Sequence, residues 1–144
     1  MSGTKTDYIF DFAAMKNVVA RMNNKSEDAA VIFLTSFGQV QGEIVYTENI
    51  DISSEDSLGD DLEKLFGEGK KLDIFSLTDS YYYQKVREEQ KELGIDKPIP
   101  EHAIPLKNVE VRYTNGSTAK LEGMLLFSDQ IAGIIPGVFG KEWL

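Results

Sequence analysis

The chain has no cysteine and a single histidine, His102. Without cysteine it has no disulfides, no thiolate metal sites and no cysteine nucleophiles, and a reducing compartment is the expected setting. One histidine is too few for a histidine-rich metal site, and the sequence contains neither a phosphate-binding loop nor a nucleophile elbow of the hydrolase type. We interpret His102 as a solvated loop residue and expect a non-catalytic protein without a cofactor or a metal.

Long apolar runs are also missing. No segment approaches the ~20 apolar residues of a membrane span, and the first residues, MSGTKTD, lack the apolar core of a signal peptide. We therefore expect a cytoplasmic protein that does not enter a membrane. The 144 residues, 42% hydrophobic and 27% charged, fit one globular domain with a real core.

Basic residues are sparse. The formal net charge is −9, and no three basic residues occur in a row, which disfavours nucleic acid as a partner. Residues 51–70 hold seven acids and two lysines. A calcium loop starting at Asp51 would need glycine at its sixth position and glutamate at its twelfth, where the chain has Asp56 and Leu62. We interpret this stretch as the solvated start of a helix.

Residues 31–46, VIFLTSFGQVQGEIVY, predict two strands joined by a bend. The first part is almost continuously apolar and rich in branched and aromatic side chains, which is typical of a buried strand. The second part alternates, so one of its faces is buried and the other is wet. An isolated glycine within a strand often marks a bulge or a bend, so Gly42 is a candidate for the point where the strand curls. A curled barrel and a flatter sheet both fit.

Residues 7–23 predict an amphipathic helix. Its large apolar side chains recur at spacings of four and three, which places them on one face. We expect this face to pack against the sheet, and the alternative is a docking helix for a partner. The stripe consists of Tyr8, Phe12, Met15, Val19 and Met22.

The middle of the chain predicts a helical excursion. A helix is expected at 58–66, a short strand at 72–77, and a second helix that is capped within 78–80 and runs to Leu93, where Gly94 ends it. Three tyrosines follow each other at the start of this second helix. Consecutive helical residues point about 100° apart, so at least one ring is exposed or at an interface. Tyr81, Tyr82 and Tyr83 are therefore candidate partner contacts.

The last third predicts a three-stranded meander. Strands are expected at 106–113, 119–127 and 130–135, with a hairpin turn at Asn115-Gly116. The tail, VFGKEWL, is apolar and aromatic. Such a tail packs on its own domain or fills a groove on a neighbour, which makes Phe139 and Trp143 further candidate partner contacts.

Two stretches resemble the Sm-like small barrel of RNA-associated proteins. One contains Gly38 and Gly42 followed by Glu43-Ile44, and the other is Leu-Glu-Gly-Met-Leu-Leu at 121–126. In that family a helix precedes five curled strands. The resemblance therefore implies a small bent five-stranded sheet or barrel behind the N-terminal helix.

The residues with which that family binds RNA are not matched. The family places an aspartate and then an asparagine after the second strand, whereas this chain has Glu48 near the first position, Ile52 at the second, and Asn49 out of register. A basic residue before the glycine of the fourth strand is replaced by Glu122. A carboxylate there would repel phosphate, so the resemblance concerns the fold and not the RNA chemistry.

The sequence thus predicts a single α+β domain over residues 1–144, with an inserted helical segment at about 49–103. We expect a binding or assembly module whose partner is a protein, or a second copy of the chain. One alternative is an Sm-like RNA-associated protein, which would need its basic residues to gather into a patch. Another is a small-molecule-binding or enzyme domain with the insert as a lid. The basic residues in question are Lys107, Arg112 and Lys120.

Overall fold

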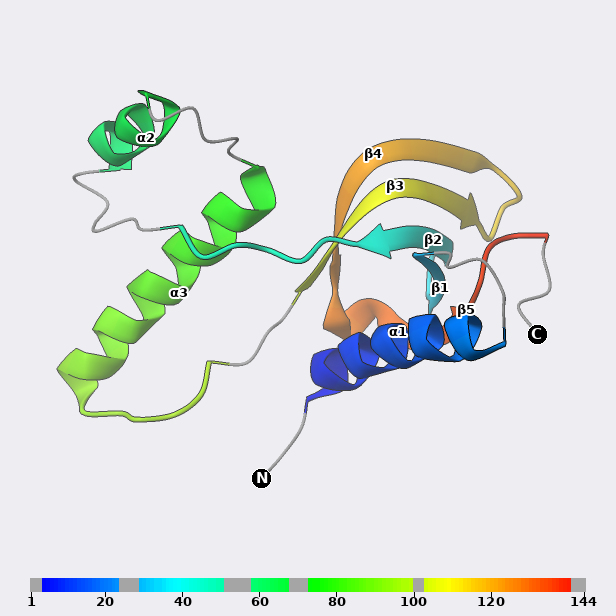
Figure 1. The fold of residues 1–144 in the computed structure, drawn as a ribbon, viewed down its shortest axis with the longest axis horizontal. Coiled ribbons are helices and arrows are strands. Elements are labelled where there is room, and N and C mark those ends of the chain that lie inside the picture. The colour runs from blue at the N-terminus through cyan, green and yellow to red at the C-terminus, as the bar shows by residue number, and fades with distance from the viewer. Residues whose placement is uncertain (1–3, 24–28, 51–57, 68–72, 100–102, 141–144) are drawn as a thin grey trace. The chain divides into compact units, whose positions relative to one another are not determined.

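The computed structural model describes residues 4–23, 29–50, 58–67, 73–99 and 103–140. The chain divides into two compact units, of which the first combines Met1–Val45 with Pro100–Leu144 and the second is Tyr46–Ile99. The first unit contains helix α1 and the sheet, and the second contains α2 and α3 (Figure 1). The second unit covers most of the segment that the sequence marks as inserted.

Five strands form one antiparallel sheet in the order β4-β3-β2-β1-β5. This confirms the expected α+β fold with an N-terminal helix, a five-stranded antiparallel sheet and inserted helices. The sheet is open and does not close into a barrel, because β4 and β5 are its two edges and do not pair with each other in the described part of the chain. The strands are β1 (Ala30–Thr35), β2 (Gly38–Ile44), β3 (Ala103–Tyr113), β4 (Thr118–Phe127) and β5 (Ile131–Pro136).

Strands β3 and β4 curve together as one long hairpin (Figure 1). The pairing of β2 with β3 shifts register between Gln41 and Glu43, on either side of Gly42. On β3, Asn108 adopts a left-handed conformation with φ of 52°, and its side-chain amide donates a hydrogen bond to the Glu43 carboxylate. Gly42 therefore lies at an irregularity of the sheet, as its position in the sequence predicts.

The core lies between one face of the sheet and α1 (Lys5–Met22). Ile9 and Ala13 of the helix belong to this core. Burying an aliphatic or aromatic side chain stabilises a fold by about 1.5–3 kcal/mol, so the cluster fixes which face of α1 points inward. The largest fully buried side chains of the sheet are Phe33, Ile104, Leu106, Leu126, Val31, Val40 and Val111.

The second unit contains α2 (Leu58–Gly67), which confirms the predicted first helix, and α3 (Ile74–Leu93). The predicted strand at 72–77 and the predicted caps at 78–80 are wrong, because α3 already begins at Ile74. The Asp73 carboxylate accepts a hydrogen bond from the backbone N–H of Ser76 at 2.8 Å and so caps the helix. A short apolar run is compatible with either a strand or a helix, and the cap at Asp73 selects the helix. Gly94, with φ of 67°, ends α3 as predicted.

An extended segment, residues 46–50, is attached to α3 through two buried serines. The Ser76 hydroxyl accepts a hydrogen bond from the backbone N–H of Glu48 at 3.0 Å, and the Ser80 hydroxyl accepts one from Ile50 at 2.8 Å. The two serines are four residues apart and therefore lie on the same face of the helix. Side chains of α3 thus satisfy backbone groups that a neighbouring strand would satisfy in a sheet.

Candidate protein-contact surfaces

Helix α1 begins at a reciprocal capping box. The Thr4 hydroxyl accepts a hydrogen bond from the backbone N–H of Asp7 at 3.1 Å, and the Asp7 carboxylate accepts one from the backbone N–H of Thr4 at 3.0 Å. The bonds from the Thr4 backbone and side chain lower the pKa of Asp7 below its ordinary value. This cap satisfies free backbone groups of the first turn and so stabilises the start of α1.

The inner face of α1 carries small and polar residues. Alongside Ile9 and Ala13, the buried positions are Thr6, Lys16 and Ala20. The Lys16 ammonium donates a hydrogen bond to the carbonyl oxygen of Ala30, so the buried amine is anchored on β1. A second lysine, Lys5, donates to the carbonyl oxygens of Ser128 and Ile131 at 3.1 and 3.0 Å and anchors the start of the helix at the β4–β5 connection.

The outer face of α1 is apolar and exposed. The exposed fractions are 74% for Tyr8, 58% for Met15, 36% for Val18, 37% for Val19 and 79% for Met22. Four of these belong to the stripe expected to pack on the sheet, so that expectation is wrong. We call these five residues the outer face of α1 from here on.

The error has a physical reason. Positions 6, 9, 13, 16 and 20 recur at the same spacings of three and four as the predicted stripe, so periodicity favours neither face. Side-chain size suggests the stripe, but Ala13 and Ala20 allow the helix to lie close to the sheet. Phe12, the remaining member of the stripe, is half-buried against the edge of the core.

The tyrosine triplet lies on α3 in the second unit. Tyr82 is exposed, whereas Tyr81 and Tyr83 are half-buried. The rings of Tyr82 and Tyr83 meet edge to face with centroids 5.8 Å apart, and the Lys85 ammonium lies 5.8 Å from the centre of the Tyr81 ring. The three rings therefore contact their own helix, and Tyr82 presents the most surface to solvent.

Phe139 packs on its own unit. Its ring centre lies 4.0 Å from the guanidinium carbon of Arg112, and its backbone N–H donates a hydrogen bond to the side-chain carbonyl of Gln41 at 2.7 Å. The tail up to Gly140 is thus attached to β2 and β3. Trp143 lies outside the described residues, as does His102.

The basic residues of β3 and β4 alternate with acids. Lys107 lies opposite Glu43, and Lys120 lies opposite Glu110. Arg112 lies 3.9 Å from the Glu110 carboxylate and also covers Phe139. Each of these cations therefore has an acidic neighbour, and the arrangement offers a mixed surface to a nucleic-acid backbone.

The edge strand β4 is a further exposed element. Leu121 and Phe127 on this strand are exposed, and its outer edge has no partner strand in the described part of the chain. The two residues lie six positions apart, so β4 presents separate apolar side chains. The outer face of α1, in contrast, concentrates four apolar residues in its last two turns.

Among the residues that the structure describes, no three acidic or histidine side chains lie close enough together to hold a metal ion. Within the same residues, each helix is too short or too polar to cross a bilayer. No protein family model matches the sequence, and no curated protein matches it significantly.

Proposed function

We propose that this protein is a non-catalytic assembly module that binds protein through the outer face of α1. The observation that carries the proposal is the set of five apolar side chains that this helix exposes, while its buried residues are Ile9 and four small or polar ones. Contiguous exposed apolar patches are uncommon on monomers and mark interaction sites.

Helix propensity does not explain this surface. Val18 and Val19 are β-branched and lower the stability of an isolated helix, and the exposed Met15 and Met22 gain nothing from burial where they lie. Methionine is frequent at protein-binding surfaces because its side chain adapts to the partner. A partner that covers these residues supplies the burial that the chain itself does not provide.

A photocrosslinking experiment tests the proposal. The full chain would carry a benzophenone amino acid in place of Met15 or, as a control, in place of the exposed Thr118 on β4. Irradiation in cells should give protein adducts from position 15 that position 118 does not give. An adduct supports the proposal if it meets two conditions. Val19→Glu in the same chain must remove it, and the captured protein, once purified, must bind the full chain saturably.

Equal adducts from both positions, or none from position 15, would overturn the proposal. Val19 is exposed, so its substitution by glutamate leaves the core intact, and circular dichroism of the variant checks that α1 is still folded. The readout depends on the surface of α1 and is independent of which protein covers it.

A further inference from the structure

We infer that the partner of the outer face of α1 is a second copy of this chain, with the two α1 helices packed antiparallel about a two-fold axis near Met15. This inference rests on the proposed function, because it names the occupant of the same surface. Two features of α1 support it, the spacing of its apolar residues and the placement of its charges, and the size of the face predicts how tightly the two copies bind.

The spacing is that of a helix–helix seam. Tyr8, Met15 and Met22 recur every seven residues, with Val18 and Val19 between the last two. A repeat of seven keeps the same side of one helix against another over several turns. About a two-fold axis at Met15, Tyr8 of one copy lies opposite Met22 of the other, and the two Met15 side chains meet.

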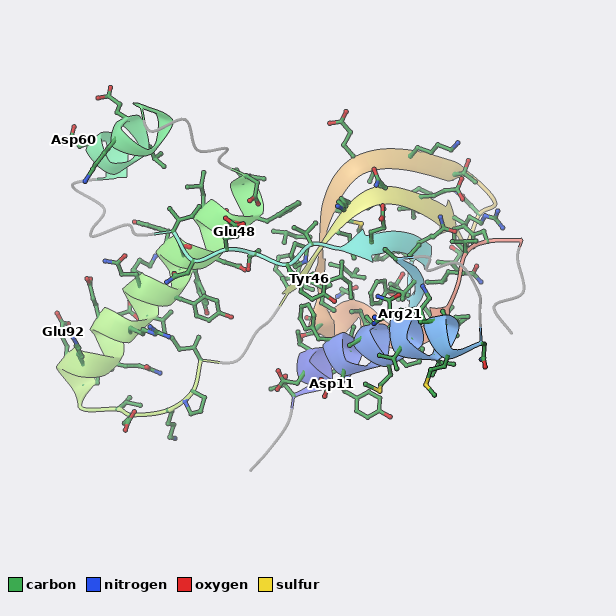
Figure 2. All side chains as sticks on the ribbon, in the orientation of Figure 1. Asp11, Arg21, Tyr46, Glu48, Asp60 and Glu92 are labelled. Atoms are coloured by element: carbon green, nitrogen blue, oxygen red, sulfur yellow. The ribbon has the colours of Figure 1, made fainter. Side chains whose placement is uncertain are left out.

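The charges on the helix are self-complementary in this arrangement. Asp11 lies in the first half of α1 and Arg21 in its last turn, and both are exposed (Figure 2). Asp11 interrupts the apolar stripe between Tyr8 and Met15, and a carboxylate that loses water in an interface needs a cation. In an antiparallel pair, Arg21 of the other copy lies at the height of Asp11, and symmetry forms this contact twice.

The apolar and the charged residues locate the axis independently. The midpoint between Tyr8 and Met22 is residue 15, and the midpoint between Asp11 and Arg21 is residue 16. One residue corresponds to about 1.5 Å along a helix, so the two estimates agree within the reach of an arginine side chain. A parallel pair would instead bring the acids of both copies to one end, where they repel.

The size of the face predicts a weak dimer. One helix from each copy gives an interface at or below about 1,200 Å², the range of transient complexes. We expect a dimer that forms in the micromolar range, so the mass measured by sedimentation should rise with concentration from 16.1 kDa toward twice that value. Val19→Glu should keep the mass at that of one chain at every concentration. Ser36→Glu in the β1–β2 turn is the control and should leave the rise in mass with concentration unchanged.

Cysteine cross-linking tests the geometry cleanly because the chain has no cysteine of its own. A disulfide needs Cα atoms about 4.4–6.8 Å apart. Met15→Cys alone should give disulfide dimers under mild oxidation. Tyr8→Cys alone should not, because the two copies of residue 8 lie roughly 21 Å apart along the pair. An equimolar mixture of Tyr8→Cys and Met22→Cys chains should cross-link.

Charge reversal tests the pairing of Asp11 with Arg21. Asp11→Arg and Arg21→Asp should each weaken the dimer about tenfold, and the double variant should restore it to within about twofold. Circular dichroism of each chain checks that α1 is folded. Failure of the double variant to recover, or a disulfide dimer of Tyr8→Cys alone, would overturn the antiparallel arrangement.

The two proposals fail in different ways. A single-chain mass at every concentration, together with a position-15 adduct to a different protein, would overturn the dimer and leave the protein-binding function standing. A single-chain mass without any position-15 adduct would overturn both. A dimer that persists in Val19→Glu would place the interface elsewhere and overturn the inference.

Discussion

Gly42 on β2 lies directly against Leu106 on β3. A Cβ atom at position 42 would be 3.2 Å from the Cβ atom of Leu106 and 3.3 Å from its Cδ1. Leu106 is fully buried, and its Cβ is fixed by the backbone of a central strand. We therefore expect Gly42→Ala to lower the free energy of unfolding by about 1–3 kcal/mol, measured by urea denaturation followed by circular dichroism.

Gly133→Ala is the matched control for that variant. A Cβ atom at position 133 would be 3.3 Å from Cδ1 of Leu34, which is the terminal methyl of a half-buried side chain and can rotate away. The loss should stay below about 1 kcal/mol. Equal losses in the two variants would show that the close approach at Leu106 is not what selects glycine.

Gly38 should tolerate substitution even less. It has a φ of 148°, and a Cβ atom there would be 2.2 Å from the carbonyl oxygen of Arg112. We expect Gly38→Ala to cost roughly 3 kcal/mol or more, since backbone strain and overlap add. Gly116→Ala separates the backbone strain from the steric overlap. Gly116 has a φ of 89° with open space around it, so its substitution should cost about 1–2 kcal/mol from strain alone. Chemical denaturation of both variants measures the difference.

Acid should weaken both capped helices. Bonds from Thr4 lower the pKa of Asp7. Burial raises the pKa of Asp73, but the bonds from Ser76 and Phe75 outweigh it and leave that pKa below the ordinary value. Both carboxyls therefore bind a proton less readily in the folded chain. Their stabilisation is present above about pH 3.9, the unfolded value, and is lost as the pH falls through the lowered pKa values.

NMR titration of the two carboxyl carbons would measure these pKa values directly. Asp7→Asn and Asp73→Asn should flatten the loss of helical ellipticity between about pH 4 and pH 2. A pKa of Asp7 at or above about 3.9 would contradict the capping geometry.

Ser80 should hold residues 46–50 on α3. Ser80→Ala removes the acceptor of the Ile50 N–H, a bond of 2.8 Å, and should destabilise this attachment by about 1–2 kcal/mol. Amide hydrogen exchange of Ile50 should speed up accordingly. Thr78→Ala is the control, because Thr78 is exposed on the same helix, and unchanged exchange in both variants would contradict the role of the hydroxyl.

The strands and their turns could be predicted from the sequence because their signals are local. One such signal is the apolar run that begins at Val31, which predicts a buried strand. Another is Asn115-Gly116, which predicts a hairpin turn. Each signal sets the conformation of its own stretch of backbone and has one main interpretation. The start of α3 could not be placed in this way. Asp73 caps it in the structure, but Thr78, Asp79 and Ser80 are residues of the same capping type. In the structure Asp79 accepts a hydrogen bond from Thr47 and Ser80 accepts one from Ile50, and these partners are distant in the sequence.

The outer face of α1 shows a second limit. The helix itself could be predicted, but its rotation depends on which face fits the sheet. Lysine is mostly solvent-exposed in proteins, yet the Lys16 ammonium donates a hydrogen bond to the Ala30 carbonyl in the interior. Periodicity shows which residues share a face of the helix, whereas the shape of the sheet surface opposite determines which face is buried. That information lies in residues far away in the sequence.

The second unit leaves and rejoins the sheet at neighbouring points of two paired strands. The backbone N–H of Val45 donates to the carbonyl oxygen of Pro105 at 2.9 Å, one step beyond the pairing of Ile44 with Leu106. Because this closure is made by the two strands themselves, the register of the sheet does not depend on the length or composition of Tyr46–Ile99. Insertions and deletions can therefore accumulate in that segment over generations while the sheet is inherited unchanged, and an unrelated domain can be grafted at the same junction.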